Sequence, residues 1–455
     1  MEQDLTTGSV FKRIVYFSLP YLLSYFLQTL YGMADLFITG QFYGVDTITA
    51  VSNGSQIMHM MTVIIVGLAM GTAVTIGHSV GAKCMEQAEK IIGNTITLFM
   101  GIAVAFTVIL VVLVKPIVVL IATPQEAVAG TSIYLLICFI GIPFITAYNI
   151  ISSIFRGLGD SKSPMYFIGI ACVMNIALDY LFMGAFHMGA AGAALGTVCA
   201  QTFSVLVALW VIRRRKTGIS LKKSDFKIET AVIGQVLKIG IPVALQDGFI
   251  QVAFMIITVI ANSRGVSDAA AVGVVEKVIS ALFIVPSSML ATVSALSAQN
   301  LGAGKEKRAT DTLHYATVIT TIYGMIVAVL IQFIAENVVG IFTSDTTVVT
   351  MGSAYIRSYI WDCIFAGIHF SFSGYFAACG KSYIGFLHNI IYICACSGFV
   401  SGIEIFYRYA VSNGTCGTGG VTGIRGNLCD CIYIVKEKKP CGTDSMNQDG
   451  KSFNR

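Results

Sequence analysis

The chain has 455 residues, of which 55% are apolar and only 12% are Asp, Glu, Lys or Arg, and its mean hydropathy is +0.78. Soluble proteins carry about a quarter charged residues, so this chain has too little polar material to coat a water-soluble protein of its size. Composition therefore excludes soluble enzymes and disordered proteins, and the long apolar runs predict an all-α polytopic membrane protein rather than a β-barrel.

Apolar runs of about twenty residues indicate the helices that we expect to span the membrane. The first run starts near Ile14 and is too long for a cleavable signal, so we expect it to be the first anchor. An eleventh helix is expected from about Tyr383 and a twelfth between about residues 410 and 433, where the sequence is poorly suited to a membrane helix. The ten clear helices are expected at residues 14–40, 47–76, 91–114, 127–155, 163–184, 189–212, 232–260, 269–297, 310–334 and 348–378.

Basic residues are distributed unevenly between the loops on the two sides. If the N-terminus is cytoplasmic, seventeen Lys and Arg residues fall on the inner side, seven of them within residues 213–227, and only Lys115 and Arg264 fall on the outer side. The positive-inside rule then predicts a multi-pass protein of the cell membrane with its N-terminus in the cytoplasm. Residues 213–227 are interpreted as a solvated linker that also touches anionic lipid.

The sequence repeats itself at a nearly constant interval. Pro20 and Pro242 are 222 residues apart, and Gly81 and Gly302, within HSVGAK and QNLGAG, are 221 apart. Each half holds about six helices, an even number, so the halves should be related by an axis along the membrane normal. This predicts two pseudo-symmetric six-helix bundles with a substrate path between them.

The repeat divides the chain into four expected parts. Residues 1–212 form an N-terminal lobe, 213–230 a basic cytoplasmic linker and 231–390 the clear helices of a C-terminal lobe. Residues 391–455 form an atypical tail, rich in Gly and with Arg425 where an apolar sixth helix is expected. We interpret this tail as a reading-frame shift near residue 393, with sequence divergence as the alternative. Resequencing the DNA distinguishes the two.

Two acidic residues of the first half lie inside predicted helices. An acid at the middle of a membrane helix costs about 2.5–3.5 kcal/mol on insertion scales, so such residues are functional by default. Asp35 and Asp179 each lie five residues before the expected outer end of a helix, near Gly40 and Gly184, which predicts a similar depth. The alternative is that either acid only hydrogen-bonds to polar neighbours and stabilises the lobe.

Polar residues accompany these two acids at helical spacing. Asn175 lies one turn before Asp179, and Tyr31 and Gln28 lie one and two turns before Asp35. Thr197 and Asn149 are expected at the same level on the sixth and fourth helices. Such a site can bind H⁺, Na⁺ if enough oxygens gather, or a cationic drug. Since one negative charge satisfies one cation at a time, exchange follows from competition.

The second half contains the acids Asp247, Glu276 and Asp362, together with Lys277 and Arg357. Internal ion pairs are therefore an alternative to a functional role for these acids. The chain also has 17 Met, 28 Phe and 19 Tyr residues, which suit unselective binding of flat hydrophobic cations but are equally ordinary packing material.

Several segments in order resemble one family of efflux transporters, the multidrug and toxic compound extrusion (MATE) family. They are SLPYLLSYFLQTLYGMADLFITGQF, GHSVGAKCMEQAEK, FRGLGDSKSPM and NIALDYLFM, and the similarity spans roughly residues 10–390. The resemblance implies twelve helices in two lobes and export of organic cations and other drugs in exchange for H⁺ or Na⁺. It also implies that Asp35, Asn175, Asp179 and Thr197 match positions used for cation coupling.

The resulting hypothesis is a secondary active multidrug antiporter, not an enzyme. A lipid-linked oligosaccharide flippase of related fold is the alternative within transport, although it would need several basic residues in its cavity. A receptor is a further alternative, in which the duplication has no role. We expect cationic hydrophobic drugs and membrane lipid as partners, no nucleic acid, a monomer, and no cofactor or metal, because the Cys-x-Cys spacings of the tail do not fit a zinc site.

Overall fold

The computed structural model describes residues 4–121, 123–214, 221–343 and 345–390. The expected twelfth helix and the interpretation of residues 391–455 lie outside this part of the chain. Within it, the structure is helical, as the composition predicts.

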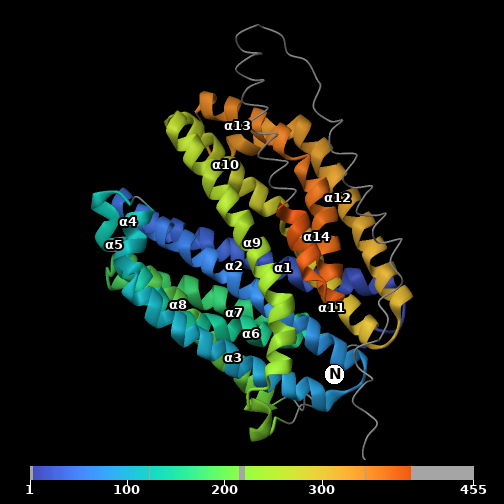
Figure 1. The fold of residues 1–455 in the computed structure, drawn as a ribbon. Coiled ribbons are helices and arrows are strands. Elements are labelled where there is room, and N and C mark those ends of the chain that lie inside the picture. The colour runs from blue at the N-terminus through green and yellow to red at the C-terminus, as the bar shows by residue number, and fades with distance from the viewer. Residues whose placement is uncertain (1–3, 122, 215–220, 344, 391–455) are drawn as a thin grey trace, which may run out of the picture. The chain divides into compact units, whose positions relative to one another are not determined.

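The first half of the chain folds into long helices and one π-helical turn (Figure 1). They are α1 (Val10–Phe42), α2 (Val45–Gly81), α3 (Met85–Val112), α4 (Val114–Leu120), α5 (Gln125–Ile140), α6 (Ile142–Gly157), α7 (Lys162–Asp179), the π-helix η1 (Tyr180–Ala185) and α8 (Gly189–Arg214).

The second half begins with a short 3₁₀ turn and continues as helices. Residues 382–390 are also helical, where the eleventh helix is expected to begin. The elements are η2 (Lys223–Phe226), α9 (Thr230–Arg264), α10 (Val266–Leu282), α11 (Ile284–Gly302), α12 (Glu306–Gly340), α13 (Thr346–Tyr359) and α14 (Asp362–Ala378).

Within the described residues, seven helices are long and apolar enough to cross a membrane, or eight if the bent pair α5–α6 counts as one span. Each of the ten clear helices expected from the sequence is helical, with bounds that move by a few residues. α1, although 33 residues long, is outside this set of seven. Its polar residues, Asp35 among them, lower its hydropathy.

Three stretches predicted as single helices are broken in the structure. α5 and α6 meet at Gly141 with a bend of 51°, α10 and α11 meet at Phe283, and α13 and α14 are separated by residues 360–361. Pro143 and Pro286 lie just after the first two breaks. Because proline has no N–H and its ring clashes with the preceding turn, a helix bends or ends just before it.

A helical carbonyl normally accepts a hydrogen bond from the N–H four residues later, and each of these two prolines lacks that N–H. A hydroxyl of a neighbouring helix donates to the carbonyl instead. Thr107 Oγ1 on α3 donates to Phe139 O at 3.0 Å, and Tyr323 OH on α12 donates to Leu282 O at 2.9 Å. Satisfied carbonyls of this kind make breaks tolerable in a membrane helix, where water is not available.

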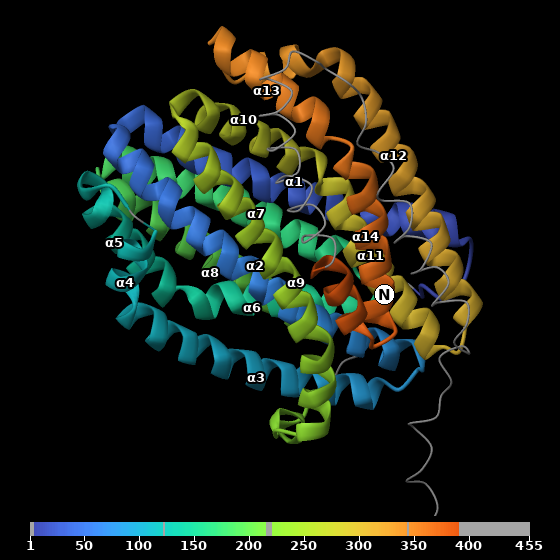
Figure 2. The ribbon, with the colours of Figure 1, turned by 45° about the horizontal axis from the view of Figure 1, so that its top comes forward.

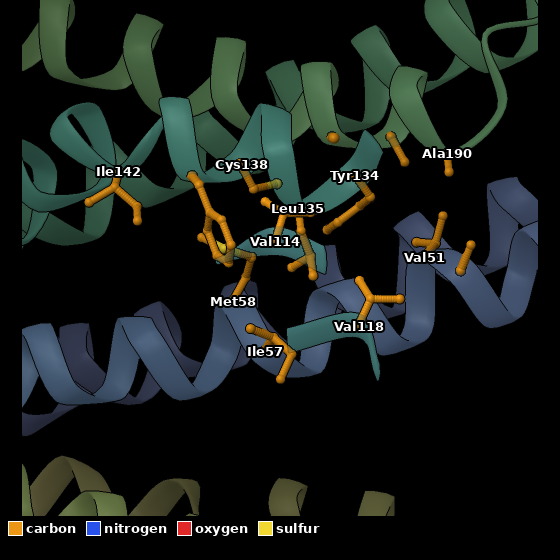
Figure 3. Packing of buried hydrophobic residues seen from close by; sticks show 14 of the residues in the cluster. Val51, Ile57, Met58, Val114, Val118, Tyr134, Leu135, Cys138, Ile142 and Ala190 are labelled. Atoms are coloured by element: carbon orange, nitrogen blue, oxygen red, sulfur yellow. The ribbon is translucent and has the colours of Figure 1, made fainter. Parts of the chain in front are cut away.

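The core of the first half lies where α2 packs on α5 (Figure 3). Ile57 and Met58 of α2 meet Leu135 and Cys138 of α5, while α4 adds Val118 from the side. A second cluster joins α10, α12 and α13 in the second half, with Val275, Ile279, Ile331, Ala335 and Ile356 buried in it. Each half therefore has apolar packing of its own.

The two halves pack together mainly where α9 lies along α2, as both views show (Figures 1 and 2). Small residues make this close approach possible: a side-chain carbon at Gly67 would overlap the backbone of Ala244, and one at Gly71 would overlap Val236 O. Close helix packing through small residues is the ordinary way in which membrane helices associate. The α1 helix begins at one end of the bundle, where residues 221–229 also lie. We call this end the linker end.

Candidate functional site

The two acids of the first half meet through one shared amide. Asp35 of α1 is 3% exposed and Asp179, the last residue of α7, is fully buried. Asn175 Nδ2 lies 3.4 Å from Asp35 Oδ1 and 3.4 Å from Asp179 Oδ1 and donates toward both. Two carboxyl groups so close together in a buried setting cannot both carry an uncompensated negative charge, so the pair requires a cation.

The backbone changes its geometry immediately after Asp179, where α7 passes into the π-helix η1. π-helical turns are rare and occur frequently at functional sites. Tyr43, just after α1, fixes this turn: its hydroxyl donates to Met183 O at 3.0 Å and accepts from Gly189 N at 2.9 Å. The end of α1, the π-helix and the start of α8 are thus tied together beside the acids.

Gly196 of α8 gives the Asp179 carboxyl its space. A side-chain carbon built at this glycine would overlap Asp179 Oδ1. The sequence GAAGAALG predicts close packing between helices, and at this position the packed partner is a carboxylate oxygen. Only a residue without a side chain allows α8 to approach so closely.

Four buried oxygens around the acids accept no hydrogen bond from the described residues. They are Asp179 Oδ2, Asn175 Oδ1, Thr197 Oγ1 and Gln201 Oε1. Thr197 lies close enough to Asp35 to interact with its carboxyl, without the geometry of a regular hydrogen bond. Buried polar atoms are normally satisfied, so oxygens without donors indicate a site for a positively charged partner.

A small pocket lies beside these groups. Its walls come from α1, α7 and α8. The lining residues are Tyr31, Ile168, Ala171, Cys172, Asn175, Thr197, Ala200 and Gln201.

The structure brings together some of the residues predicted for this site and leaves two apart. Tyr31, Asn175 and Thr197 line the same pocket. Asn149 instead donates from Nδ2 to Ile145 O of its own helix at 2.8 Å. Gln28 is half-buried and makes no hydrogen bond to this group among the described residues. Correct helical depth was not enough to predict which side chains turn inward.

Sequence reasoning missed two members of the site, Gln201 and Gly196. Gln201 follows Thr197 by one helical turn and therefore lies on the same face of α8, a signal that could have been used. For Gly196 the sequence indicated only close helix packing, because its contact with Asp179 depends on the distance between α7 and α8.

Among the described residues, Asp247, Glu276 and Asp362 form no ion pair with Lys277 or Arg357. Arg357 pairs with Glu336 at 3.1 Å, and Glu276 accepts from Thr258 Oγ1 at 3.0 Å. Tyr355 lies near both Glu276 and Asp362.

Asp247 lies on α9, next to the other half. It is close enough to Tyr25 of α1 to interact with it, so this acid belongs to the interface between the halves.

A pair of histidines in the second half was not predicted. The Nδ1 atoms of His369 and His388 are 2.7 Å apart, so one ring donates to the other. Beside them, Gln246 of α9 accepts from Ser373 Oγ at 2.9 Å and from Asn389 Nδ2 at 3.2 Å. Among the described residues, no group of three His, Cys, Asp or Glu side chains could hold a metal ion.

The acid pair has no equivalent in the second half at the α1 position. The residue 222 positions after Asp35 is Ile257. α1 and α9 thus correspond as helices but differ at this position, which holds an acid in the first half and an isoleucine in the second. Buried facing acids in one half of a duplicated helical bundle are features of ion-coupled secondary transporters.

The sequence model of the MatE family matches residues 20–181 and again residues 242–400. The two matches begin at Pro20 and Pro242, the first landmarks of the internal repeat. The chain belongs to the MatE family, the MATE transporters for multidrug efflux.

Among its relatives, the chain is 30% identical over 389 residues to the probable multidrug resistance protein YpnP of Bacillus subtilis, covering 85% of this chain and 87% of that protein. It is 23% identical over 374 residues to the multidrug export protein MepA of Staphylococcus aureus, covering 82% of each.

Solved structures share the fold. A transporter of the MOP superfamily from Pyrococcus furiosus has a TM-score of 0.79 at 21% identity, covering 85% of this chain and 86% of that one. An outward-facing multidrug resistance MATE transporter gives the same TM-score, identity and coverage. The two-lobe helical fold predicted from the repeat is confirmed.

Proposed function

We propose that this chain is a secondary active antiporter that exports hydrophobic organic cations in exchange for an inward-moving H⁺ or Na⁺, and that Asp35 and Asp179 bind the coupling cation. The observation that carries the proposal is the shared Asn175 amide, which donates toward both carboxyls, while no basic side chain of the described residues pairs with either acid. The names of relatives, such as the multidrug export protein MepA, support the substrate class.

Exchange follows from the charge of this pair. A proton or Na⁺ between the carboxyls removes one unit of the negative charge that would otherwise attract an organic cation. Once that ion leaves, the pair regains its charge and favours a cationic drug. Because the site is buried, the two states differ strongly in energy, and this difference couples the two movements.

A proton is the first candidate, because one proton shared between two facing carboxyls needs no further oxygen ligand. The second candidate, Na⁺, is favoured by the four buried oxygens without donors, since Na⁺ binds to several oxygens at once. A proton would satisfy the carboxyls alone.

We place the drug between the lobes, residues 1–212 and 231–390, with the basic linker and the N-terminus in the cytoplasm. Asp247 of α9 is within electrostatic reach of Tyr25 of α1, and a carboxylate together with an aromatic side chain suits an aromatic cation. Asp362 and Glu276 are secondary candidates for drug contact.

The first test removes the charges. Asp35→Asn and Asp179→Asn should each reduce ethidium efflux to the background of cells without the transporter, while membrane abundance stays near the unsubstituted level. Asp46→Asn, an exposed acid in the first turn of α2, is the matched control and should keep normal efflux. Efflux retained in Asp35→Asn would remove this residue from the mechanism.

The second test identifies the ion. Dye efflux is measured in membrane vesicles of the full chain while the proton gradient and the sodium gradient are collapsed separately. Loss of efflux with the proton gradient alone supports H⁺ coupling, and loss with the sodium gradient alone supports Na⁺ coupling. If neither collapse changes efflux, antiport is wrong.

A further inference from the structure

At the linker end, two side chains cross from one half of the molecule to the other. His78, near the end of α2, donates from Nε2 to Ala378 O, at the end of α14, over 2.7 Å. Gln299, near the end of α11, donates from Nε2 to Gly157 O, at the end of α6, over 2.9 Å. Each half therefore gives one donor and one acceptor to the other.

These two bonds are the same bond, made twice. His78 and Gln299 are 221 residues apart, and so are Gly157 and Ala378, which is the interval of the internal repeat. In each half, a side chain near the end of the second helix donates a hydrogen bond to the other half. The acceptor is the last carbonyl of the fourth helix of that other half. A contact that recurs in both directions across the repeat axis follows from the assembly of the halves, not from the packing within either one.

The backbones touch at the same place and in the same reciprocal way. A side-chain carbon at Gly81 would overlap Gln299 O, and one at Gly302 would overlap His78 O. Gly77 faces Ala298, and these two residues are also related by the repeat. Gln299 is 1% exposed and Ala298 fully buried, so water does not compete for the Gln299 bond while the helices stay together.

We propose that His78 and Gln299 form a paired lock that holds the two halves together at the linker end, and that both bonds must break before a substrate path opens there. This inference rests on the proposed transport function, because an antiporter must expose its site to each side in turn. Since the axis relates the bonds, a rotation that separates the halves breaks both together.

The lock is tested by the exposure of a thiol at the contact. Ala298→Cys adds only a sulfur, opposite Gly77, and is labelled with N-ethylmaleimide in membranes containing the full chain. Mass spectrometry measures labelling at this position and at native Cys138, which is fully buried in the core of the first half. Slow labelling at position 298 reports the fraction of time that the halves are apart.

Loss of one hydrogen bond should raise labelling at position 298 by about fivefold, since the net contribution of such a bond is ~1 kcal/mol. His78→Ala and Gln299→Ala should each have this effect, and the double variant about 25-fold. The matched control exchanges the residues, His78→Gln with Gln299→His, which keeps a donor at each position and should stay within about twofold of the parent.

Unchanged labelling at position 298 in the double variant would overturn the lock. A parallel rise at Cys138 would overturn it as well, because the substitutions would then loosen the helices instead of separating the halves. An effect of one single variant without the other would contradict the reciprocal arrangement. Labelling does not depend on an ion gradient, so failure of the proposed antiport would appear in the efflux tests and not here.

Discussion

At the scale of single residues, the acid site depends on a glycine as much as on its charged groups. Asp179 keeps its position because Gly196 leaves the space that its carboxyl oxygen occupies. Its neighbour Asn175 connects it to Asp35. The functional groups and the packing of α7 on α8 are therefore one feature, and a small change in packing should alter the chemistry.

Gly196→Ala should displace the Asp179 carboxyl, because the added methyl group overlaps its oxygen. We expect loss of most dye efflux and a destabilisation of about 1–3 kcal/mol, the usual cost of overpacking. Thermal unfolding of the purified chain in detergent measures the second effect. Gly101→Ala is the control: nothing lies within 4 Å of that position, so efflux should persist and stability should stay equal or rise slightly. Equal behaviour of the two variants would contradict this account.

At the scale of helices, two of the three breaks combine a proline with a hydroxyl from a neighbouring helix. Pro143 and Pro286 free Phe139 O and Leu282 O, and the helices beside them supply a hydroxyl to each. The breaks at Gly141 and Phe283 are thus held by partners on α3 and α12. A prediction from apolar runs cannot find such a break, since the runs continue through it.

Tyr323→Phe removes the hydroxyl that donates to Leu282 O, so that carbonyl loses this hydrogen bond. The expected destabilisation is about 1–3 kcal/mol, the cost of an unsatisfied buried group. Tyr315→Phe, on the same helix but with an exposed ring, should be neutral. Thermal unfolding in detergent compares the two. A midpoint for Tyr323→Phe equal to that of Tyr315→Phe would show that the hydroxyl is not needed at the break.

At the scale of the whole molecule, each half begins with a segment that is bound to the other half. Arg308 of α12 donates to Gly8 O at 2.7 Å and to the carbonyls of Leu5 and Thr7, before α1. Asn94 of α3 donates to Asp225 O at 3.1 Å and accepts from Glu229 N at 2.7 Å, before α9. Both segments lie at the linker end, beside the His78 and Gln299 bonds.

Arg308→Ala should release residues 4–8, and Asn94→Ala should release residues 222–229, each without effect on the other segment. Hydrogen–deuterium exchange of the full chain measures this, with roughly tenfold faster exchange expected in the released segment. Arg308→Lys keeps the charge but lacks the fork that reaches several carbonyls, so it should give an intermediate rate. Faster exchange throughout the helices would instead indicate general destabilisation.

The sequence by itself determined the membrane class, the duplication, the helices and the two acids of the first half, because apolar runs, a repeat interval and charges inside apolar runs are local properties of the chain. It also predicted that Asn175 and Thr197 lie near the acids, since helical spacing sets depth and face. Only the tertiary structure decided that Gly196 holds Asp179, that Asn149 turns to its own helix, that Arg357 pairs with Glu336, and that His78 and Gln299 cross between the halves. These are contacts between helices far apart in sequence, and their distances depend on how the helices pack, which no local pattern encodes.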